Sequence, residues 1–445
     1  MYAFFLATFF RQILYSPKKK SLKFSKMFLS FARWKYMRVC VRKSFLFVLF
    51  LLGSALCFAE KPSVVYASYL GDPTSSIVLF WHTSMQDEAS SICYKKVGDA
   101  SWNAAEGSFV KPNKYETYFH SVAVKGLEAD SIYQFRIGRE EKLYQFRTLS
   151  GEDHVPVRYV TGGDAYRYLS LFRKMNRTIA KQNPDFIVVG GDVAYSHGGI
   201  TLFKGKGWEM RRWMTFLQEW QKTMVDSFGC MIPLIPVVGN HDVKKALSDP
   251  RQGSVLFYEL FFPPDQYASY RVLDIGKKMS LLLLDTGHTA PIESQVGWIE
   301  DTLKERASTA FPVAIYHVGA YPSVYPYQGG VPTKIRSTWS PIFEKYRLRL
   351  AFENHNHAYK RTYPLKEDQF DPEGVIYMGD GCWGVAPRKT RSNLWYVEKK
   401  ASKNCCTLIV ADTARCAIEV FDIGGKIIDS LQLSPFAAEE MASVP

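Results

Sequence analysis

The chain has 445 residues, of which 47% are hydrophobic, so it can form more than one domain with a substantial core and is neither disordered nor fibrous. Its formal net charge of +13 comes mainly from residues 1–59, which hold eleven Lys or Arg and no Asp or Glu. The remaining residues hold 45 basic and 43 acidic side chains, a net charge of +2, which argues against a nucleic-acid partner.

The first 59 residues have the layout of a leader. A cationic stretch from Met37 to Lys43 precedes an apolar run from Ser44 to Ala59 that ends in small residues. This order is typical of a secretory signal peptide cleaved after Ala59, and it favours Met37 as the true start of translation. The apolar run is shorter than the roughly 20 residues of a spanning helix. We therefore predict a secreted or periplasmic protein with no stable membrane span; an uncleaved membrane anchor is the alternative.

Short runs of alternating polarity follow between residues 60 and 152, separated by turn-forming residues. They are residues 76–81, 91–96, 118–124, 133–137 and 144–148. Regular spacing of this kind predicts an antiparallel β-sandwich. Leu127 and Tyr133 resemble a tyrosine corner, and the Cys–Trp–Cys spacing of immunoglobulin domains is missing, so the sandwich resembles a fibronectin type III domain. It contains no cluster of metal ligands, which favours a role in support or partner binding.

From residue 153 to residue 435 the pattern changes to alternating strands and helices. Residues 168–182 have helical spacing and join two apolar runs, as in a βαβ unit. We predict a βαβ-rich domain of two sheets with flanking helices, followed by a tail at 436–445. Its further expected elements are a helix at 208–228 with a core face formed by Trp213, Phe216, Leu217 and Trp220, and paired strands at 406–411 and 417–421 that complete a second sheet.

Five apolar runs in this domain each end beside a potential metal ligand. The residues at or after the ends of these runs are Asp164, Asp192, Asn240, His317, and the pair His355 and His357. Short β-branched runs bounded by Gly are typical of buried strands, and ligands of open α/β sheets bind beyond the carboxyl ends of the strands. Any one of these residues alone is more often a cap or turn former. Five in order predict a single metal site with oxygen and imidazole donors, which suit Fe, Mn or Zn.

The order of these motifs resembles the metallophosphoesterase superfamily. The motifs are Gly-Gly-Asp at 162–164, Gly-Asp-Val-Ala-Tyr at 191–195, Gly-Asn-His-Asp at 239–242, Tyr-His-Val at 316–318, and Asn-His-Asn-His at 354–357. Tyr195, three residues after Asp192, and the sandwich ahead of this domain resemble the purple acid phosphatase branch. The likeness covers residues 62 to about 430.

This resemblance implies a binuclear centre. Asp192 bridges both metals, Asp164, Tyr195 and His357 complete the first site, and Asn240, His317 and His355 complete the second. A free Tyr has a pKa of about 10, so its binding as phenolate requires a strong Lewis acid such as Fe(III). We therefore expect Fe(III) with a divalent Fe, Zn or Mn, and a visible colour.

The chain departs from the family pattern at three places. Asn354 replaces the usual Gly before the paired histidines, and Tyr166 replaces a small residue, where we expect its ring at the mouth of the cleft. Related plant enzymes carry substrate-contacting histidines after the position of His317, where this chain has tyrosines instead. The candidate contacts to phosphate or leaving group are Arg167, Tyr325 and Tyr327.

The predicted activity is hydrolysis of a small-molecule phosphate monoester by attack of a metal-bound hydroxide. The cationic centre attracts the phosphate, and His241, next to Asn240, stabilises the transition state or protonates the leaving oxygen. His241 and Asp192 are the expected catalytic residues of this metal-dependent acid phosphatase. The alternatives are a phosphodiesterase or pyrophosphatase on the same metals, and a non-catalytic secreted protein that binds a partner.

Overall fold

The computed structural model describes residues 61–84, 90–112, 114–197, 207–244, 250–264, 266–379 and 381–436. All of these described residues belong to one compact unit. The predicted leader and nearly all of the predicted tail therefore lie outside the described residues. Among the helices that are described, none combines the length and the apolar character that crossing a membrane requires.

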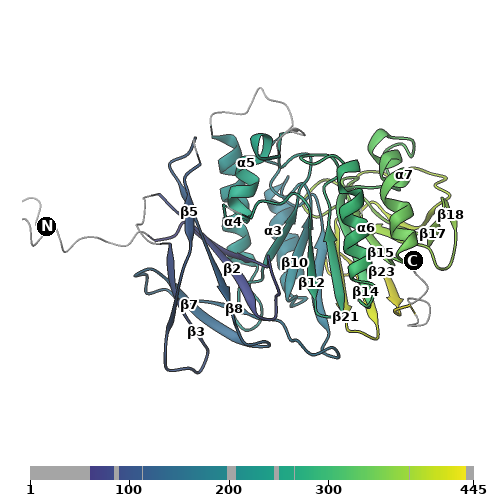
Figure 1. Cartoon of the computed structure of the whole chain (residues 1–445). Coiled ribbons are helices and arrows are strands. Elements are labelled where there is room, and N and C mark those ends of the chain that lie inside the picture. The colour runs from purple at the N-terminus through teal and green to yellow at the C-terminus, as the bar shows by residue number, and fades with distance from the viewer. Residues whose placement is uncertain are drawn as a thin grey trace, which may run out of the picture. The chain divides into compact units, whose positions relative to one another are not determined.

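The N-terminal part is an antiparallel β-sandwich of two four-stranded sheets (Figure 1). One sheet has the order β1-β2-β6-β5 and the other β4-β3-β7-β8. Their strands are β1 (Val64–Ser68), β2 (Ser76–Thr83), β3 (Ser91–Lys96), β4 (Asn103–Glu106), β5 (Ser108–Val110), β6 (Tyr118–Lys125), β7 (Ile132–Ile137) and β8 (Tyr144–Arg147). Tyr133 Oη accepts a hydrogen bond of 2.9 Å from the backbone N–H of Glu128, which is the contact that a tyrosine corner makes.

Two further sheets, one of six strands and one of seven, form the larger C-terminal part. The first has the order β11-β10-β9-β21-β22-β23 and the second β12-β13-β14-β15-β19-β16-β20. The first contains β9 (Val157–Gly162), β10 (Phe186–Gly190), β11 (Leu234–Val237), β21 (Cys405–Ala411), β22 (Cys416–Asp422) and β23 (Ile427–Leu433). The second contains β12 (Arg271–Ile275), β13 (Met279–Leu283), β14 (Phe311–Val318), β15 (Leu350–Asn354), β16 (Tyr359–Thr362), β19 (Ile376–Gly379) and β20 (Val397–Ala401); β17 (Leu365–Lys366) and β18 (Gln369–Phe370) form a separate pair.

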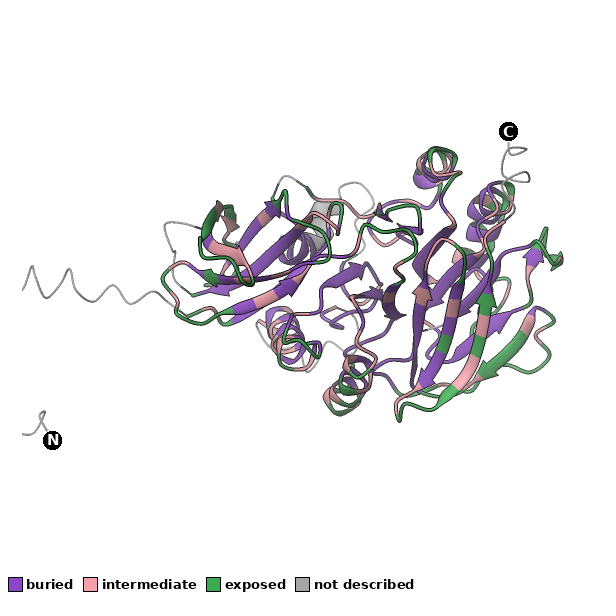
Figure 2. Ribbon diagram, turned by 90° about the horizontal axis from the view of Figure 1, so that it is seen from below, coloured by how far each residue is buried: buried purple, intermediate pink, exposed green. Residues whose placement is uncertain are grey.

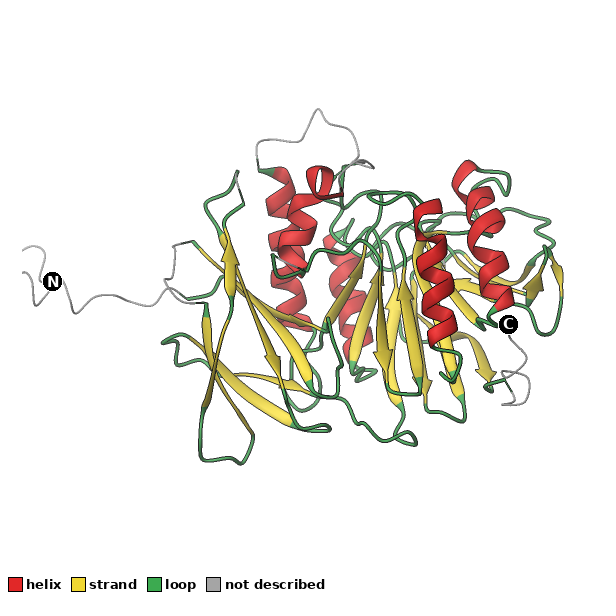
Figure 3. Cartoon of the chain, in the orientation of Figure 1, coloured by secondary structure: helices red, strands yellow, loops and turns green. Residues whose placement is uncertain are grey.

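Helices cover the outer face of each of these two sheets (Figures 1 and 3). The helices are α3 (Leu169–Ala180), α4 (Trp208–Thr223), α5 (Pro250–Phe261), α6 (Val296–Glu305), which the short turn η2 (Glu293–Gln295) precedes, and α7 (Gly330–Lys345). Successive side chains of a strand point to opposite faces, so each buried strand contributes to two cores. In β10, Val188 lies in the core between the sheets, whereas Ile187 packs with Phe172 and Trp213 from the helices.

The same alternation holds the second sheet against its helices. Ile315 of β14 faces the core between the sheets, and Ala314 packs in a cluster with Ile335 and Trp339 of α7. Both faces of the central strands are therefore buried, which explains why these strands read as continuous apolar runs. Figure 2 shows the buried residues concentrated in the central strands, with exposed residues on edge strands and turns.

Two predicted elements differ from the structure. The helix expected at 208–228 ends at Thr223, because Val225 forms a β-bridge with Met231 across a turn in which Gly229 has a φ of 83°. The C-terminal strands β21 and β22 pair antiparallel as expected, but β21 also pairs with β9. These strands therefore extend the first sheet, the one that carries Asp164 and Asp192.

The sandwich is bonded to the C-terminal part through buried and half-buried contacts. Arg147 forms an ion pair of 2.6 Å with Asp185, and the Oη of Tyr66 donates a 2.5 Å hydrogen bond to the carbonyl of Leu260. The side-chain oxygen of Gln221 in α4 accepts a 2.9 Å hydrogen bond from the backbone of β1. These contacts fix the sandwich against α4, α5 and the residue that precedes β10, and none of them involves the predicted metal ligands.

Candidate metal centre

The predicted metal ligands lie at the carboxyl ends of parallel strands. Strands β9, β10 and β11 are parallel, as are β14 and β15, so the chain leaves each group of strands at the same edge. The six side chains concerned are Asp164 after β9, Asp192 after β10, Asn240 after β11, His317 near the end of β14, and His355 and His357 after β15. Tyr195 follows Asp192 in the same loop.

Three of these side chains form a first donor group. Tyr195 Oη lies 2.5 Å from Asp164 Oδ1 and 3.1 Å from His357 Nε2. His357 Nε2 in turn lies 2.8 Å from Asp164 Oδ1. All three side chains are buried, and their donor atoms converge on one point although the residues are separated by up to 193 positions in sequence.

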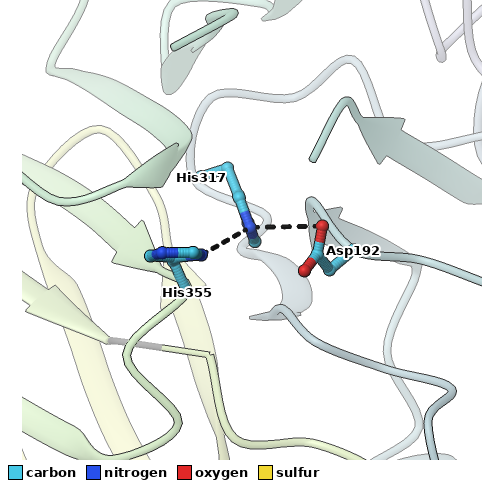
Figure 4. Close-up of side chains that lie close together, drawn as sticks. All are labelled: Asp192, His317 and His355. Carbon is cyan, nitrogen blue, oxygen red and sulfur yellow. Dashed lines mark hydrogen bonds and ion pairs between the residues drawn. The ribbon is translucent and has the colours of Figure 1, made fainter. Parts of the chain in front are cut away.

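A second donor group surrounds His317 (Figure 4). His317 Nε2 lies 3.1 Å from Asn240 Oδ1, 3.3 Å from Asp192 Oδ1 and 3.2 Å from His355 Nδ1. Ligand atoms of Asp192, His317 and His355 all lie within 4.8 Å of one another. The two groups adjoin, because the backbone N–H of His355 donates a 2.9 Å hydrogen bond to Asp164 Oδ2.

The spacing of these atoms suits metal ions. Two ligand atoms that each lie about 2.1 Å from one ion are roughly 3.0–3.4 Å apart at ordinary coordination angles. Asp192 Oδ2 is buried without a hydrogen-bond partner, and a buried carboxylate oxygen in that state requires a cation or a donor. The donor set therefore fits cation binding, and Asp192, His317 and His355 lie close enough together to hold one ion.

Backbone strain is concentrated at the same residues. Positive φ values, which disfavour residues other than Gly, occur at five of the seven predicted ligands: Asp164 (55°), Asp192 (51°), Tyr195 (52°), His355 (79°) and His357 (61°). Such conformations cost on the order of 1–3 kcal/mol each and persist where surrounding contacts impose them. The concentration of positive φ values at the predicted ligands indicates that the fold gives up some stability to hold these side chains in position.

The pKa values follow from burial and the crowding of charge. Burial and the Asp164 carboxylate raise the pKa of Tyr195 well above 10. Burial lowers the pKa of His317, but Asp192 outweighs this effect and raises it to about 9. Burial and the charge of His317 lower the pKa of His355 to about 4. A cation that binds here must displace protons from Tyr195 and His317, so its uptake is coupled to proton release.

Glycines allow the strand ends to approach closely. A Cβ on Gly190 or Gly163 would lie 2.1 Å or 2.7 Å from side-chain atoms of Asn354. Asn354 therefore fills the space between the ends of the two sheets, where its Nδ2 donates a 3.0 Å hydrogen bond to the carbonyl of Tyr316. The replacement of a Gly by Asn at this position is accommodated by the two neighbouring glycines.

His241 is held beside the donor groups by backbone contacts. Its backbone N–H donates a 2.7 Å hydrogen bond to Asp192 Oδ1, and its Nδ1 lies 3.0 Å from the carbonyl oxygen of His197. A carbonyl only accepts, so Nδ1 carries a proton and Nε2, 3.9 Å from Asp192 Oδ2, faces the site. The ring stacks on Tyr195 with centroids 4.7 Å apart, and a quarter of the side chain is exposed to solvent.

Two adjacent family models match the chain. The model of the purple acid phosphatase N-terminal domain matches residues 62–148, and that of the calcineurin-like phosphoesterases matches residues 154–359. The chain is a purple acid phosphatase-like metallophosphoesterase. It is thus a metallophosphoesterase in which a β-rich N-terminal domain precedes the α/β domain that carries the two donor groups.

Similar proteins agree with this assignment. The chain is 23% identical over 338 residues to probable purple acid phosphatase 20 of Arabidopsis thaliana, covering 72% of this chain and 74% of that protein. It is 24% identical over 345 residues to purple acid phosphatase 23 of the same plant, covering 70% and 72%. The fold is similar to that of purple acid phosphatase PPD1 from yellow lupin seeds, with a TM-score of 0.71, 15% identity, and coverage of 86% and 76%.

The candidate substrate contacts lie in different environments. Arg167 is exposed, with its guanidinium 5.6 Å from the ring centre of Tyr195, and Tyr325 stacks on His355. Tyr327 lies instead in another cluster, where Arg336 lies over its ring and Tyr396 stacks on it. The structure thus brings Arg167 and Tyr325 to the donor groups and packs Tyr327 elsewhere.

The expected position of Tyr166 at the mouth of the cleft is wrong. Tyr166 is buried, packs against Phe172 and Phe216, and lies 3.7 Å below the guanidinium of Arg212. Helix α4 therefore covers the ring of Tyr166, although Asp164 and Arg167, close to it in the sequence, lie at the site.

Sequence reasoning overlooked three residues that support the site. Asp242 accepts backbone hydrogen bonds from the loops that carry Asp192 and Asn240, and its place beside His241 in the motif was a usable signal. His197 holds His241 and forms a 2.7 Å contact with Glu209. Arg388 donates a 2.6 Å hydrogen bond to Tyr325 Oη, and no motif surrounds it in the sequence.

Proposed function

We propose that this chain hydrolyses phosphate monoesters at a centre of two metal ions. The first ion would bind Asp164, Tyr195 and His357, the second would bind Asn240, His317 and His355, and Asp192 would bridge them. The proposal is supported by the gathering of these donors into two adjoining groups and by the buried Oδ2 of Asp192, which accepts no hydrogen bond. When bound, the two cations would polarise the phosphoryl group and lower the pKa of a water molecule.

We further propose that one of the ions is Fe(III), paired with divalent Fe, Zn or Mn. Burial and Asp164 both oppose ionisation of Tyr195, so only a strongly polarising ion would bind it as phenolate. Metal analysis of the purified protein, together with its visible spectrum, tests this assignment. We expect iron and an absorption band that disappears in Tyr195→Phe; an iron-free, colourless preparation that hydrolyses phosphate esters would refute the iron assignment alone.

His241 is the proposed proton donor to the leaving oxygen. Since Nδ1 is bonded to the carbonyl of His197, only Nε2 is directed toward the substrate, and it can donate when the ring is protonated. Arg167 would bind a phosphate oxygen, because its guanidinium lies next to Tyr195 at the surface. Asp192 would hold both ions, and its carboxylate also accepts the backbone N–H that fixes His241.

Turnover of three substrates tests the activity. We expect an aryl phosphate monoester to be hydrolysed faster than the corresponding diester or pyrophosphate. Asp192→Ala and His241→Ala should lower monoester turnover, by about 100-fold or more for a lost general acid. Val97→Ala, on an exposed turn of the sandwich, is the matched control. Wild-type turnover in both site variants would refute the catalytic assignment.

The proposal includes export and a supporting N-terminal domain. We propose a leader at 1–59, a fibronectin type III-like domain at 60–152, a catalytic domain at 153–435 and a tail at 436–445. The cationic and apolar segments before Ala59 support export. Mass spectrometry of the protein recovered outside the cytoplasm should find a new N-terminus at Glu60; an intact leader would indicate a membrane anchor instead.

A further inference from the structure

A cavity of about 400 Å³ opens directly beside the second donor group. Asn240 and His355, two of the proposed ligands, form part of its wall. The rest of the wall is mainly apolar and includes Val318, Pro322, Tyr325, Pro326, Val331 and Pro332. The volume lies within the range of pockets that hold small organic molecules.

The chemistry of this wall does not suit the phosphate itself. Besides Asn240 and His355, the polar side chains in the wall are those of His288 and Asn356, whose Nδ2 is buried without a hydrogen-bond partner. Against the proline and valine side chains that form most of the wall, a phosphate dianion would lose its hydration without gaining a donor. An apolar group bonded to the phosphate would instead leave water and contact these side chains. Because the cavity is continuous with Asn240 and His355, a phosphoryl group at the metal site would direct its ester substituent into it.

Tyr325 forms an aromatic wall that is already in place. Its ring stacks on His355 with centroids 5.1 Å apart and an angle of 26°. Arg388 donates a 2.6 Å hydrogen bond to its Oη, and the guanidinium lies 5.3 Å from the ring centre. The backbone of this segment is also fixed, because Asn356 Oδ1 accepts hydrogen bonds from the N–H groups of Val324 (2.9 Å) and Tyr325 (3.1 Å). Little ordering is therefore needed when a ligand binds.

We propose that this cavity binds the alcohol portion of the substrate and selects phosphate monoesters of aromatic alcohols. The aromatic ring of the substrate would lie between Tyr325 and Val331, with its phosphate at the two ions. This inference rests on the proposed phosphatase activity and adds the substrate class. It predicts that polar esters of similar size, such as glycerol phosphate, are poor substrates.

The test compares benzyl phosphate, ethyl phosphate and glycerol 1-phosphate, which all release a primary alcohol. We expect kcat/KM for benzyl phosphate to exceed both others by about tenfold or more, since a single methylene group in an apolar pocket can change it by that factor. Val331→Trp fills the cavity and should lower kcat/KM for benzyl phosphate about tenfold more than it lowers kcat/KM for ethyl phosphate. Ser337→Trp adds the same side chain to an exposed position of α7 and is the control.

Each outcome separates the two proposals. If wild-type protein hydrolyses all three esters at similar kcat/KM, the cavity assignment fails and the phosphatase activity stands. If it hydrolyses none, the proposed function fails and the cavity assignment falls with it. An equal loss on benzyl and ethyl phosphate in Val331→Trp also overturns the assignment. Should that variant not fold, Tyr325→Ala must lower the preference for benzyl phosphate and Tyr325→Phe must retain it.

Discussion

The buried ion pair between Glu353 and Lys360 should be a major determinant of stability near the site. Both side chains are fully buried, and Lys360 Nζ contacts Glu353 Oε2 directly. The carboxylate also accepts hydrogen bonds from Tyr316 Oη (2.8 Å) and from the backbone N–H of Ala320 (2.6 Å). The pair therefore joins β15 and β16 to the end of β14, immediately behind His317.

Removal of the cation alone should be costly. In Lys360→Met the carboxylate remains buried with hydrogen bonds but no counter-charge, and breaking a buried pair in this way costs about 3–5 kcal/mol. The double variant Glu353→Gln/Lys360→Met removes both charges and keeps an acceptor for Tyr316, so it should recover about 1–3 kcal/mol of that loss. The surface pair of Lys345 with Glu300 (2.8 Å) provides the control, because solvent screens an exposed pair and Lys345→Met should cost much less than Lys360→Met.

Urea unfolding of the full chain, followed by tryptophan fluorescence, measures these differences. A loss in Lys360→Met that only equals that of Lys345→Met would refute the reasoning. A double variant that is less stable than Lys360→Met would also refute the reasoning.

Four further outcomes are expected. Asp242→Ala leaves buried backbone N–H groups without an acceptor. It should lower the metal content of the protein and lower the free energy of unfolding, measured by urea titration, by at least about 1–3 kcal/mol. If both quantities are unchanged, the role assigned to this carboxylate is wrong. Hydrogen bonds from Arg173 lower the pKa of Glu219 from 4.5 to about 2, so the stability from this pair is present above pH 4.5 and is lost as the pH falls toward 2. Glu219→Gln should therefore flatten the dependence of stability on pH between these values, and an unchanged slope would argue against the pair. Phe172→Ala opens a cavity in the core under α3 and should lower the free energy of unfolding by about 3–5 kcal/mol in the same titration. A loss under about 1 kcal/mol would mean that neighbouring side chains move into the cavity. Removal of metal ions with a chelator should lower the melting temperature reversibly, because ions at 100 times their Kd stabilise the fold by about 2.7 kcal/mol. An unchanged melting curve would show that the folded protein binds no ion.

Much of the fold could be predicted because its central strands are buried on both faces. The runs that end before Asp164, Asp192 and Asn240 are continuous and apolar, and they are the parallel strands β9, β10 and β11. The helix expected at 168–182 is α3 (Leu169–Ala180), since its apolar spacing matches a helical face that packs on this sheet. The likeness to purple acid phosphatases was also readable, because the motifs follow one another in a fixed order.

Other features depend on contacts between remote segments. Tyr166 faces the core because Arg212 and Phe216 of α4 cover it, and no local pattern reports which helix lies above a loop. Arg388 reaches Tyr325 from more than 60 positions away. In the same way, β21 completes the first sheet by pairing with β9 across most of the C-terminal part.

The sequence by itself indicated the central buried strands and the polar side chains that follow them, because the periodicity of apolar residues and the glycines at the strand ends are local properties. Tertiary structure alone decided that Asp192 Oδ2 has no partner, that Tyr325 forms one wall of a cavity, and that Lys360 neutralises Glu353. The physical reason is that burial, electrostatic compensation and the shape of a pocket are properties of several segments packed together, and no single segment encodes them.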